Sequence, residues 1–145
     1  MMHSTPDPDR REGQPVAMDL VIEVDNEPGA LARVATAISD AGVNIAAATC
    51  MAGATKAELH ILVPHAEAAR HALAISNQAI TSEREVVVVD AEDRPGALAD
   101  LARKVAQAGV NLDLVYIATG TRVVFGSDDI DALRACLGQE VGALR

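Results

Sequence analysis

The same pentapeptide occurs twice in this sequence, and the repeat restricts the possible folds more than any other feature. Residues 28–32 and 95–99 both read Pro-Gly-Ala-Leu-Ala, at an offset of 67 residues. Gly-Val-Asn at 42–44 recurs at the same offset, and the ungapped alignment of 28–45 with 95–112 has ten identities in eighteen positions. Chance would give roughly one or two. One supersecondary unit is therefore predicted to occur twice.

The hydrophobic pattern of the first copy predicts the order strand, helix, strand, strand, helix, strand. Apolar and polar residues alternate over 19–25 and over 56–63, which is typical of half-buried strands. Between them, apolar residues recur at helical spacing from Leu31 to Ala41, and Gly42 is suited to end that helix. The remaining elements are expected at 44–51 (strand), 64–76 (helix) and 79–82 (strand).

The second copy repeats this order from residue 85, with a final helix expected over 128–137 and capped by Ser127. Its last strand is expected to be short or missing. The predicted fold class is α+β, with two ferredoxin-like βαββαβ units side by side and the helices of each on one face of an antiparallel sheet. The expected division is a disordered N-terminal tail over 1–17, one domain over 18–83 and a second over 84–145.

The sheet face turned away from the helices is predicted to differ between the copies. In the first copy it carries polar residues, namely Asp19, Glu23, Glu58 and His60. In the second copy it is predicted to carry apolar residues, namely Val86, Val88, Val115, Ile117 and Val124. Strands that are apolar on both faces are covered on both faces. We therefore expect the second sheet to be buried in a homodimer, with the N-terminal tail as the alternative cover.

The composition argues against several classes of function. The formal net charge is −9, with one Phe, one Tyr and no Trp, so neither phosphate contacts nor base stacking favour nucleic-acid binding. No apolar stretch reaches the roughly 18 residues of a membrane span. Cys50 and Cys136 are expected to be free, buried thiols in a cytoplasmic protein. The histidines lack partners at metal-ligand spacing, and we expect no metal, no cofactor and no catalytic residues.

Each Pro-Gly turn leads from a strand into a helix, and this position suits a carboxylate. Glycine leaves the backbone open to a ligand, and the next N–H groups lie at the positive end of the helix dipole. Asn26 and Asp93 precede the prolines, where they can fold back on the turn or accept from an ammonium group. Asn44 and Asn111 are expected to enter a strand next to the first strand. Alone, each motif is more typical of an ordinary turn or helix end.

The combined pattern resembles the ACT domain family. Its signature is an acidic or amide residue, a variable residue, Pro-Gly-X-Leu, and after the helix Gly-X-Asn with an aliphatic residue. Residues 26–31 with 42–45 match it, and so do 93–98 with 109–112. The resemblance implies a free-standing tandem of βαββαβ regulatory modules, which commonly bind amino acids at the seam between a turn and the facing strand of a neighbour. The implied ligand-binding residues are Asn26, Pro28, Gly29, Ala30, Leu31, Asn44, Ile45, Asp93, Pro95, Gly96, Ala97, Leu98, Asn111 and Leu112.

Two functions follow as hypotheses. The first is a non-catalytic sensor that binds a small amino acid or related carboxylate at the seam between its ACT units and regulates a partner. The second is a regulatory subunit or interaction module that docks on a metabolic enzyme without a ligand of its own. Arg94 stands where the first copy has Glu27, so the two sites are expected to differ in charge.

Overall fold

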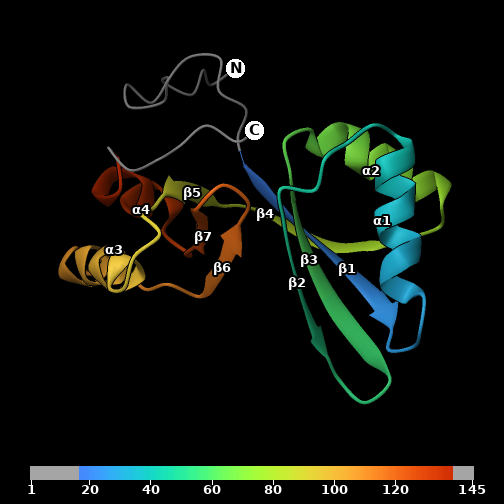
Figure 1. Ribbon diagram of the computed structural model, residues 1–145, viewed down its shortest axis with the longest axis horizontal. Coiled ribbons are helices and arrows are strands. Elements are labelled where there is room, and N and C mark those ends of the chain that lie inside the picture. Colours follow the sequence, from blue (N-terminus) through green and yellow to red (C-terminus); the bar gives the residue numbers. More distant parts are fainter. Residues whose placement is uncertain (1–16, 139–145) are drawn as a thin grey trace, which may run out of the picture.

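The computed structural model describes residues 17–138, which form two units of helices packed on antiparallel strands (Figure 1). The expected tail lies outside these residues except for Ala17, and so does any strand beyond residue 138. The first unit contains β1 (Met18–Asp25), α1 (Ala30–Asp40), β2 (Ala47–Ala52), β3 (Lys56–Val63), α2 (Ala66–Ile75) and β4 (Ile80–Glu85). The second contains β5 (Val87–Asp90), α3 (Ala97–Gln107), β6 (Leu114–Ala118), β7 (Arg122–Gly126) and α4 (Ile130–Cys136).

The first unit has the predicted ferredoxin-like arrangement. Its antiparallel strands have the order β2-β3-β1-β4, and side chains such as Leu20, Val34 and Leu59 form a core on one face of the sheet. The crossover through α1 leaves a gap between β1 and β2, and β3 fills it. The expectation that Asn44 leads into a strand beside β1 is therefore wrong.

In the second unit, three described strands have the order β5-β7-β6. Its helix-side core contains Leu101 and Phe125, the single Phe of the chain. Within residues 17–138, no strand takes the place beside β5 that β4 takes beside β1. The cap of α4 also differs from the prediction, because the Asp129 carboxylate accepts from the Ala132 amide at 3.1 Å, while Ser127 Oγ accepts from the Asp129 amide.

Gly42 and Gly109 end α1 and α3 as the sequence predicts. Their φ angles are 74° and 75°. The amide of the next residue, Val43 or Val110, donates at 3.2 Å to a carbonyl in the last turn of the helix. This Schellman geometry requires a left-handed residue, and glycine adopts that conformation at the least cost.

The open face of the second sheet is buried, and the first unit of the same chain contributes the cover. We call the shared residues the inter-unit cluster, which consists of Ala46, Ala47, Leu62, Val86, Val88, Tyr116, Ala118 and Val124. Ala47 and Leu62 are cross-strand partners on the face of the first sheet opposite the helix-side core. The two sheets therefore meet through their open faces. The apolar face that led us to expect a homodimer is thus covered within one chain.

Val115 and Ile117 do not lie on this open face, so that part of the prediction is wrong. They pair with Phe125 and Val123, which belong to the helix-side core, and cross-strand partners share a face. Because β6 is the edge strand of this sheet, Val115 and Ile117 are only partly covered and remain 44% and 70% exposed. Every residue of β6 is apolar, so alternation alone does not identify its inner side.

Asp19 and His60 were predicted on the sheet face turned away from the helices, and on that face the structure buries Asp19 completely. Asp19 Oδ1 accepts a hydrogen bond from the Tyr116 hydroxyl at 2.6 Å, and Oδ2 lies 2.7 Å from His60 Nδ1. His60 Nε2 lies 2.8 Å from Glu58 Oε1. We call Asp19, Glu58, His60 and Tyr116 the inter-unit network, because it joins β1 and β3 of the first unit to β6 of the second.

The connection between the units is very short. A single residue, Val86, separates β4 from β5. Its amide donates to the Ala17 carbonyl at 3.0 Å, and the Thr119 amide donates to the Ala46 carbonyl at 2.9 Å. These bonds fix the backbone on both sides of the inter-unit cluster.

The end of β4 is held to the second unit by two ion pairs. Arg84 Nη1 lies 2.8 Å from Asp113 Oδ1, and Arg134 pairs with Glu85. The Arg84 guanidinium also lies against Gly126, where a Cβ would come within 3.3 Å of it. Because Gly126 has no side chain, the Arg84 guanidinium can pack against its backbone.

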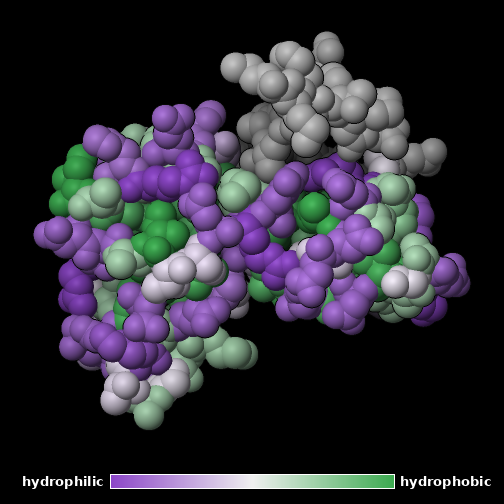
Figure 2. All heavy atoms as spheres, turned by 180° about the vertical axis from the view of Figure 1, so that it is seen from behind, coloured by the Kyte–Doolittle hydropathy of each residue, from purple (hydrophilic) through white to green (hydrophobic). Residues whose placement is uncertain are grey.

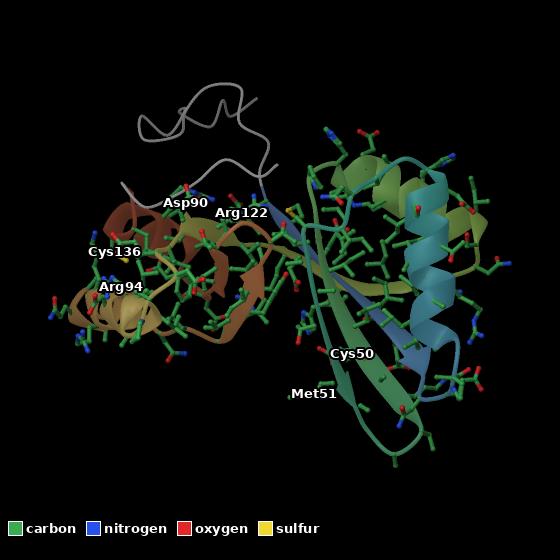
Figure 3. All side chains as sticks on the ribbon, in the orientation of Figure 1. Cys50, Met51, Asp90, Arg94, Arg122 and Cys136 are labelled. Atoms are coloured by element: carbon green, nitrogen blue, oxygen red, sulfur yellow. The ribbon has the colours of Figure 1, made fainter. Side chains whose placement is uncertain are left out.

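Both cysteines are thiols, as predicted, but neither is buried. Cys50 is exposed on β2, and Cys136 is partly exposed on α4, where its thiol donates to the Leu133 carbonyl at 3.2 Å. Figure 3 shows the two in different units. On the face in Figure 2, hydrophobic side chains form small separate groups in a mainly hydrophilic surface. Among the described helices, none is long and apolar enough to cross a membrane.

Candidate ligand-binding site

The two Pro-Gly turns have the same backbone conformation. Gly29 has φ 87° and ψ −10°, and Gly96 has φ 88° and ψ −9°. Each glycine is the N-cap of the helix that follows, α1 or α3. An L side chain would be strained at either position. The repeat in the sequence is therefore also a repeat in the structure.

Each turn is followed by backbone donors that no side chain within residues 17–138 uses. The turn itself is closed by the Ala30 amide, which donates to the Glu27 carbonyl at 3.4 Å, and by the Ala97 amide, which donates to the Arg94 carbonyl at 3.3 Å. A glycine N-cap provides no side-chain acceptor. In the part of the chain that the structure describes, no side chain accepts from the next amide of either helix. Such first-turn amides are available to an anion.

An ion pair flanks each turn, with its charges exchanged between the copies. Arg33 Nη2 lies 2.9 Å from Glu27 Oε1 in the first copy, and Arg94 Nη2 lies 2.8 Å from Asp100 Oδ2 in the second. The positions correspond, because 27 and 94, like 33 and 100, are 67 residues apart. The hydrogen bond from Arg94 is the main reason that the pKa of Asp100 is lowered. The acid lies in the turn of the first copy and in the helix of the second.

This exchange makes the start of α1 more positive than the start of α3. The first turn of α1 has no acidic residue, whereas that of α3 has Asp100. Arg33 Nη1 lies 3.4 Å from the place of a Cβ on Gly29. Arg94, seen beside α3 in Figure 3, lies similarly close to Gly96, with Nη1 3.6 Å from the place of a Cβ, but it also donates to the Pro95 carbonyl at 3.2 Å. Of the two turns, the first therefore suits a carboxylate better.

Asn26, predicted to serve the ligand, also anchors a hairpin. Its Nδ2 donates to the Gly53 carbonyl, and its backbone amide donates to the Thr55 carbonyl, both at 3.0 Å. These bonds tie the end of β1 to the β2–β3 loop. Asp93, at the corresponding position, is exposed and makes no such side-chain bond among the described residues. The two positions thus have different structural roles.

The Gly-X-Asn segments lie at the opposite ends of the helices from the turns. Asn44 and Asn111 are exposed, whereas Ile45 and Leu112 pack partly into the two helix-side cores. Both α1 and α3 have 11 residues, which at ~1.5 Å per residue separates turn and Asn by about 16 Å. A small ligand cannot contact both parts of the motif within one unit.

The two turns also do not come together within the chain. Neither contributes to the inter-unit cluster, and Figure 1 shows α1 and α3 on opposite sides of the molecule. An open hollow of about 400 Å³ extends from the first turn of α1 to the end of α2. It is lined by Ala32, Arg33, Thr36, Ala37, Asp40, Ser76 and Gln78. The candidate residues therefore form two separate sets, and the first of them adjoins a hollow.

Arg33 and Asp100 are the residues that sequence reasoning missed. Both lie beyond the matched signature, and their side chains reach back to the variable position of each turn. The signal was present, because the charges at both positions are reversed between the copies. When the charges at two positions are both exchanged between the copies of a repeat, as at 27/33 and 94/100, the exchange indicates that the two residues form an ion pair.

Comparison with known proteins supports the relationship that the motifs suggest. The ACT domain model matches residues 18–70 and 86–135. The chain belongs to the ACT domain family. The predicted tandem of ferredoxin-like ACT units is thereby confirmed, with one match in each unit. No curated protein sequence matches the chain.

Solved structures similar to this ACT protein span nearly its full length. A protein from Bacteroides thetaiotaomicron is 25% identical, with a TM-score of 0.79, over 88% of this chain and 92% of that one. The ligand-free regulatory subunit of aspartate kinase from Thermus thermophilus is 18% identical, with a TM-score of 0.61, over 86% and 91%. The corresponding subunit from Thermus flavus is 19% identical, with a TM-score of 0.58, over 87% and 92%. The two Thermus subunits share the tandem fold.

Proposed function

We propose that this tandem ACT protein binds a small amino acid and regulates a partner protein, with the ligand carboxylate held at the start of α1. The family match supports a regulatory role. The fold shared with proteins described as regulatory subunits of aspartate kinase agrees with it. The choice of site rests on the backbone amides at the start of α1, which have no side-chain cap, and on the Arg33 guanidinium beside them.

The chemistry of this turn matches a carboxylate. The amides after Gly29 lie at the positive end of the helix dipole, and no acid in the first turn of α1 neutralises it. The Arg33 guanidinium adds a charged donor next to them, at the cost of rearranging its exposed pair with Glu27. The Glu27 carboxylate is then free to accept from the ammonium group. The adjoining hollow leaves room for the ligand side chain.

The second turn is proposed to bind the same ligand more weakly or not at all. The negative charge of Asp100 already lies in the first turn of α3, at the positive end of the helix dipole. Arg94 divides its donors between Asp100, Glu92 and the Pro95 carbonyl. An incoming carboxylate would have to compete with these groups, and Asp100 would repel it.

A complete seam of the ACT type requires a second chain. Asn44 is about 16 Å from Gly29 along α1, so a strand facing the ligand must come from another module. The two units of one chain meet instead through the apolar inter-unit cluster. We therefore place the seam in a homodimer through the second sheet. Val115 and Ile117, exposed on the edge strand β6, are the residues proposed to contact the second copy.

The alternative is a module that docks on a metabolic enzyme without a ligand. Its sequence-based support was the apolar face of the second sheet, but Val86 and Val88 on that face are covered by the first unit. The exposed pair Val115 and Ile117 remains as support. Under this alternative, the donors at the start of α1 have no ligand.

Ligand screening separates the two functions. We expect one or a few of the twenty amino acids, at millimolar concentration, to raise the Tm of the full chain, since a ligand at 100 times its Kd adds about 2.7 kcal/mol. Arg33→Gln is expected to abolish the rise, whereas Arg103→Gln, an exposed arginine that pairs with Asp100, is the matched control. The absence of any rise, or an unchanged rise in Arg33→Gln, would contradict the proposed site.

A further inference from the structure

The inter-unit network contains a carboxylate that is removed from water. Asp19 has no exposed surface, and its partners are the hydroxyl of Tyr116, 97 residues away, and His60 Nδ1. A buried carboxylate is costly unless donors surround it. One donor comes from the first unit and the other from the second, so Asp19 is fully satisfied only while the two units are packed together.

His60 lies between two carboxylates. Nδ1 is 2.7 Å from Asp19 Oδ2, and Nε2 is 2.8 Å from Glu58 Oε1. A neutral imidazole has one N–H group and therefore donates to only one of these oxygens, while its other nitrogen turns a lone pair towards a carboxylate. Both contacts become hydrogen bonds only when the ring carries two protons. This arrangement of the two carboxylates therefore suits an imidazolium.

The surroundings of His60 favour the charged ring. β1 contributes Asp19 and also Glu23, the cross-strand partner of Glu58. β4 contributes Arg84, opposite Asp19 in the strand register, whose charge is paired with Asp113.

The other two elements near the ring bring no further charge to it. β2 contributes the non-titrating Thr49, the cross-strand partner of His60. β6 contributes Tyr116, whose ring lies 6.4 Å from that of His60. Burial, reinforced by Asp19, raises the pKa of Tyr116 far above 10, so its hydroxyl stays a donor.

The titration of His60 is shifted in the corresponding direction. Burial by itself lowers the pKa of the ring, but the hydrogen bonds and charges of Asp19 and Glu58 together outweigh it, and the pKa rises above 6.5. A group whose pKa is raised by folding stabilises the folded arrangement fully below its unfolded value. That stabilisation is lost as the pH rises through the folded-state pKa. The sensitive range therefore begins at about pH 6.5 and extends upward.

We propose that Asp19, His60 and Tyr116 form a proton-sensitive clamp between the two ACT units, complete when the imidazole carries two protons and weakened when it loses one. Loss of the proton removes a charged donor from the contacts of His60 with Asp19 and Glu58. The packing of the second unit on the first then depends on the Tyr116–Asp19 hydrogen bond, the inter-unit cluster, the backbone bond of Thr119, and the pairs of Arg84 and Arg134. The clamp does not depend on any ligand at the Pro-Gly turns.

The Thr119 amide provides a direct readout of the clamp, because it donates across the interface to the Ala46 carbonyl at 2.9 Å. We expect its hydrogen-exchange protection factor, corrected for the intrinsic rate at each pH, to fall as the pH rises from about 6.5. The fall is expected to be tenfold for each unit by which the pKa of His60 with the units packed exceeds its pKa with the units apart. The His60 ring signal, followed by NMR in the full-length chain, supplies the first of these pKa values. Tyr116, the single tyrosine in a chain without Trp, adds a fluorescence signal expected to change over the same range.

Two variants and a control test the assignment. His60→Gln is expected to remove the pH dependence of Thr119 protection, whereas His71→Gln, on an exposed position of α2, is expected to keep it. Asp19→Asn, if it folds, is expected to lower the pKa of His60. A pKa of His60 at or below 6.5, a Thr119 protection factor that does not change with pH, or an unaltered dependence in His60→Gln would each overturn the proposal.

Discussion

Arg94 and Asp100 form an ion pair across the second Pro-Gly turn, with the charges reversed relative to the pair at the first turn. The turn is braced in both copies, but the residue that lies in the helix is basic in α1 and acidic in α3. An acid at a helix start is favourable to the helix dipole, and a base is not. In the second copy a negative charge thus lies at the positive end of the helix dipole, while in the first copy that end has no acid of its own.

Exchanging the charges of the second pair is expected to create a second binding site. In the double variant Arg94→Glu with Asp100→Arg, the start of α3 acquires the charge arrangement of α1. We expect isothermal titration with the bound amino acid to change from one site per chain to two. The opposite exchange, Glu27→Arg with Arg33→Asp, is the companion variant and is expected to abolish binding. Equal stoichiometry in the wild type and both variants would show that these pairs do not control the site.

Truncating the core of the second unit is expected to destabilise the protein strongly. Phe125 is completely buried, so Phe125→Ala is expected to lower the free energy of unfolding by about 3–5 kcal/mol through lost burial and a residual cavity. Ile75→Ala, at a position of α2 that is 70% exposed, is the control, with an expected change within about 0.5 kcal/mol. Urea denaturation measures both. Comparable losses in the two variants would mean that Ile75 is buried in solution.

A side chain at Gly126 is expected to disturb the junction between the units. Its Cβ would lie 2.9 Å from Leu114 Cβ and 3.3 Å from the Arg84 guanidinium. We expect Gly126→Ala to cost about 1–3 kcal/mol in the free energy of unfolding, as overpacking does. Gly138→Ala is the control, since its nearest contact would be at 3.6 Å. Equal thermal melts for the two variants would show that Leu114 and Arg84 do not crowd this position.

Removing the Tyr116 hydroxyl is expected to expose the cost of burying Asp19. Tyr116→Phe keeps the ring but leaves the carboxylate with one donor fewer, which is expected to cost about 1–3 kcal/mol. Combining it with Asp19→Asn completes a double-mutant cycle that isolates the coupling of the two residues. Additive losses in chemical denaturation would argue that the 2.6 Å contact is not maintained.

A charge on the free edge of β6 is expected to separate the homodimer. Ile117 is 70% exposed, so Ile117→Lys should leave the fold of one chain intact while making burial against a second copy unfavourable. Sedimentation equilibrium is expected to show a dimer for the wild type and a monomer for the variant. Ile75→Lys, at another exposed position with 70% exposure, is the control and should stay dimeric. A wild-type monomer would refute the predicted dimer itself.

The features that sequence predicted best are the ones determined locally. The repeat placed both strand-to-helix turns, and Gly42 and Gly109 ended their helices as expected, because the helix end requires a positive φ that glycine provides. The neighbour of each strand within a unit was harder to predict. The neighbour of β2 depends on where the chain returns after α1, so Asn44 was placed beside the wrong strand.

The features that sequence missed depend on how the two units pack. Alternation correctly put Asp19 on the face away from the helices, but its burial results from Tyr116 in the other unit, which no pattern in β1 reveals. In β6, apolar residues on both faces left the inner side undetermined, and Val115 was assigned to the wrong one. At the candidate site, Arg33 was missed because it lies outside the signature and becomes relevant only through its contact with Glu27.

The junction at Val86 has a mechanical consequence. A single residue lies between two strands that belong to different sheets. The two units are therefore not joined by a flexible linker. A displacement of one unit relative to the other therefore turns about Val86, whose amide is held to the Ala17 carbonyl by a backbone hydrogen bond.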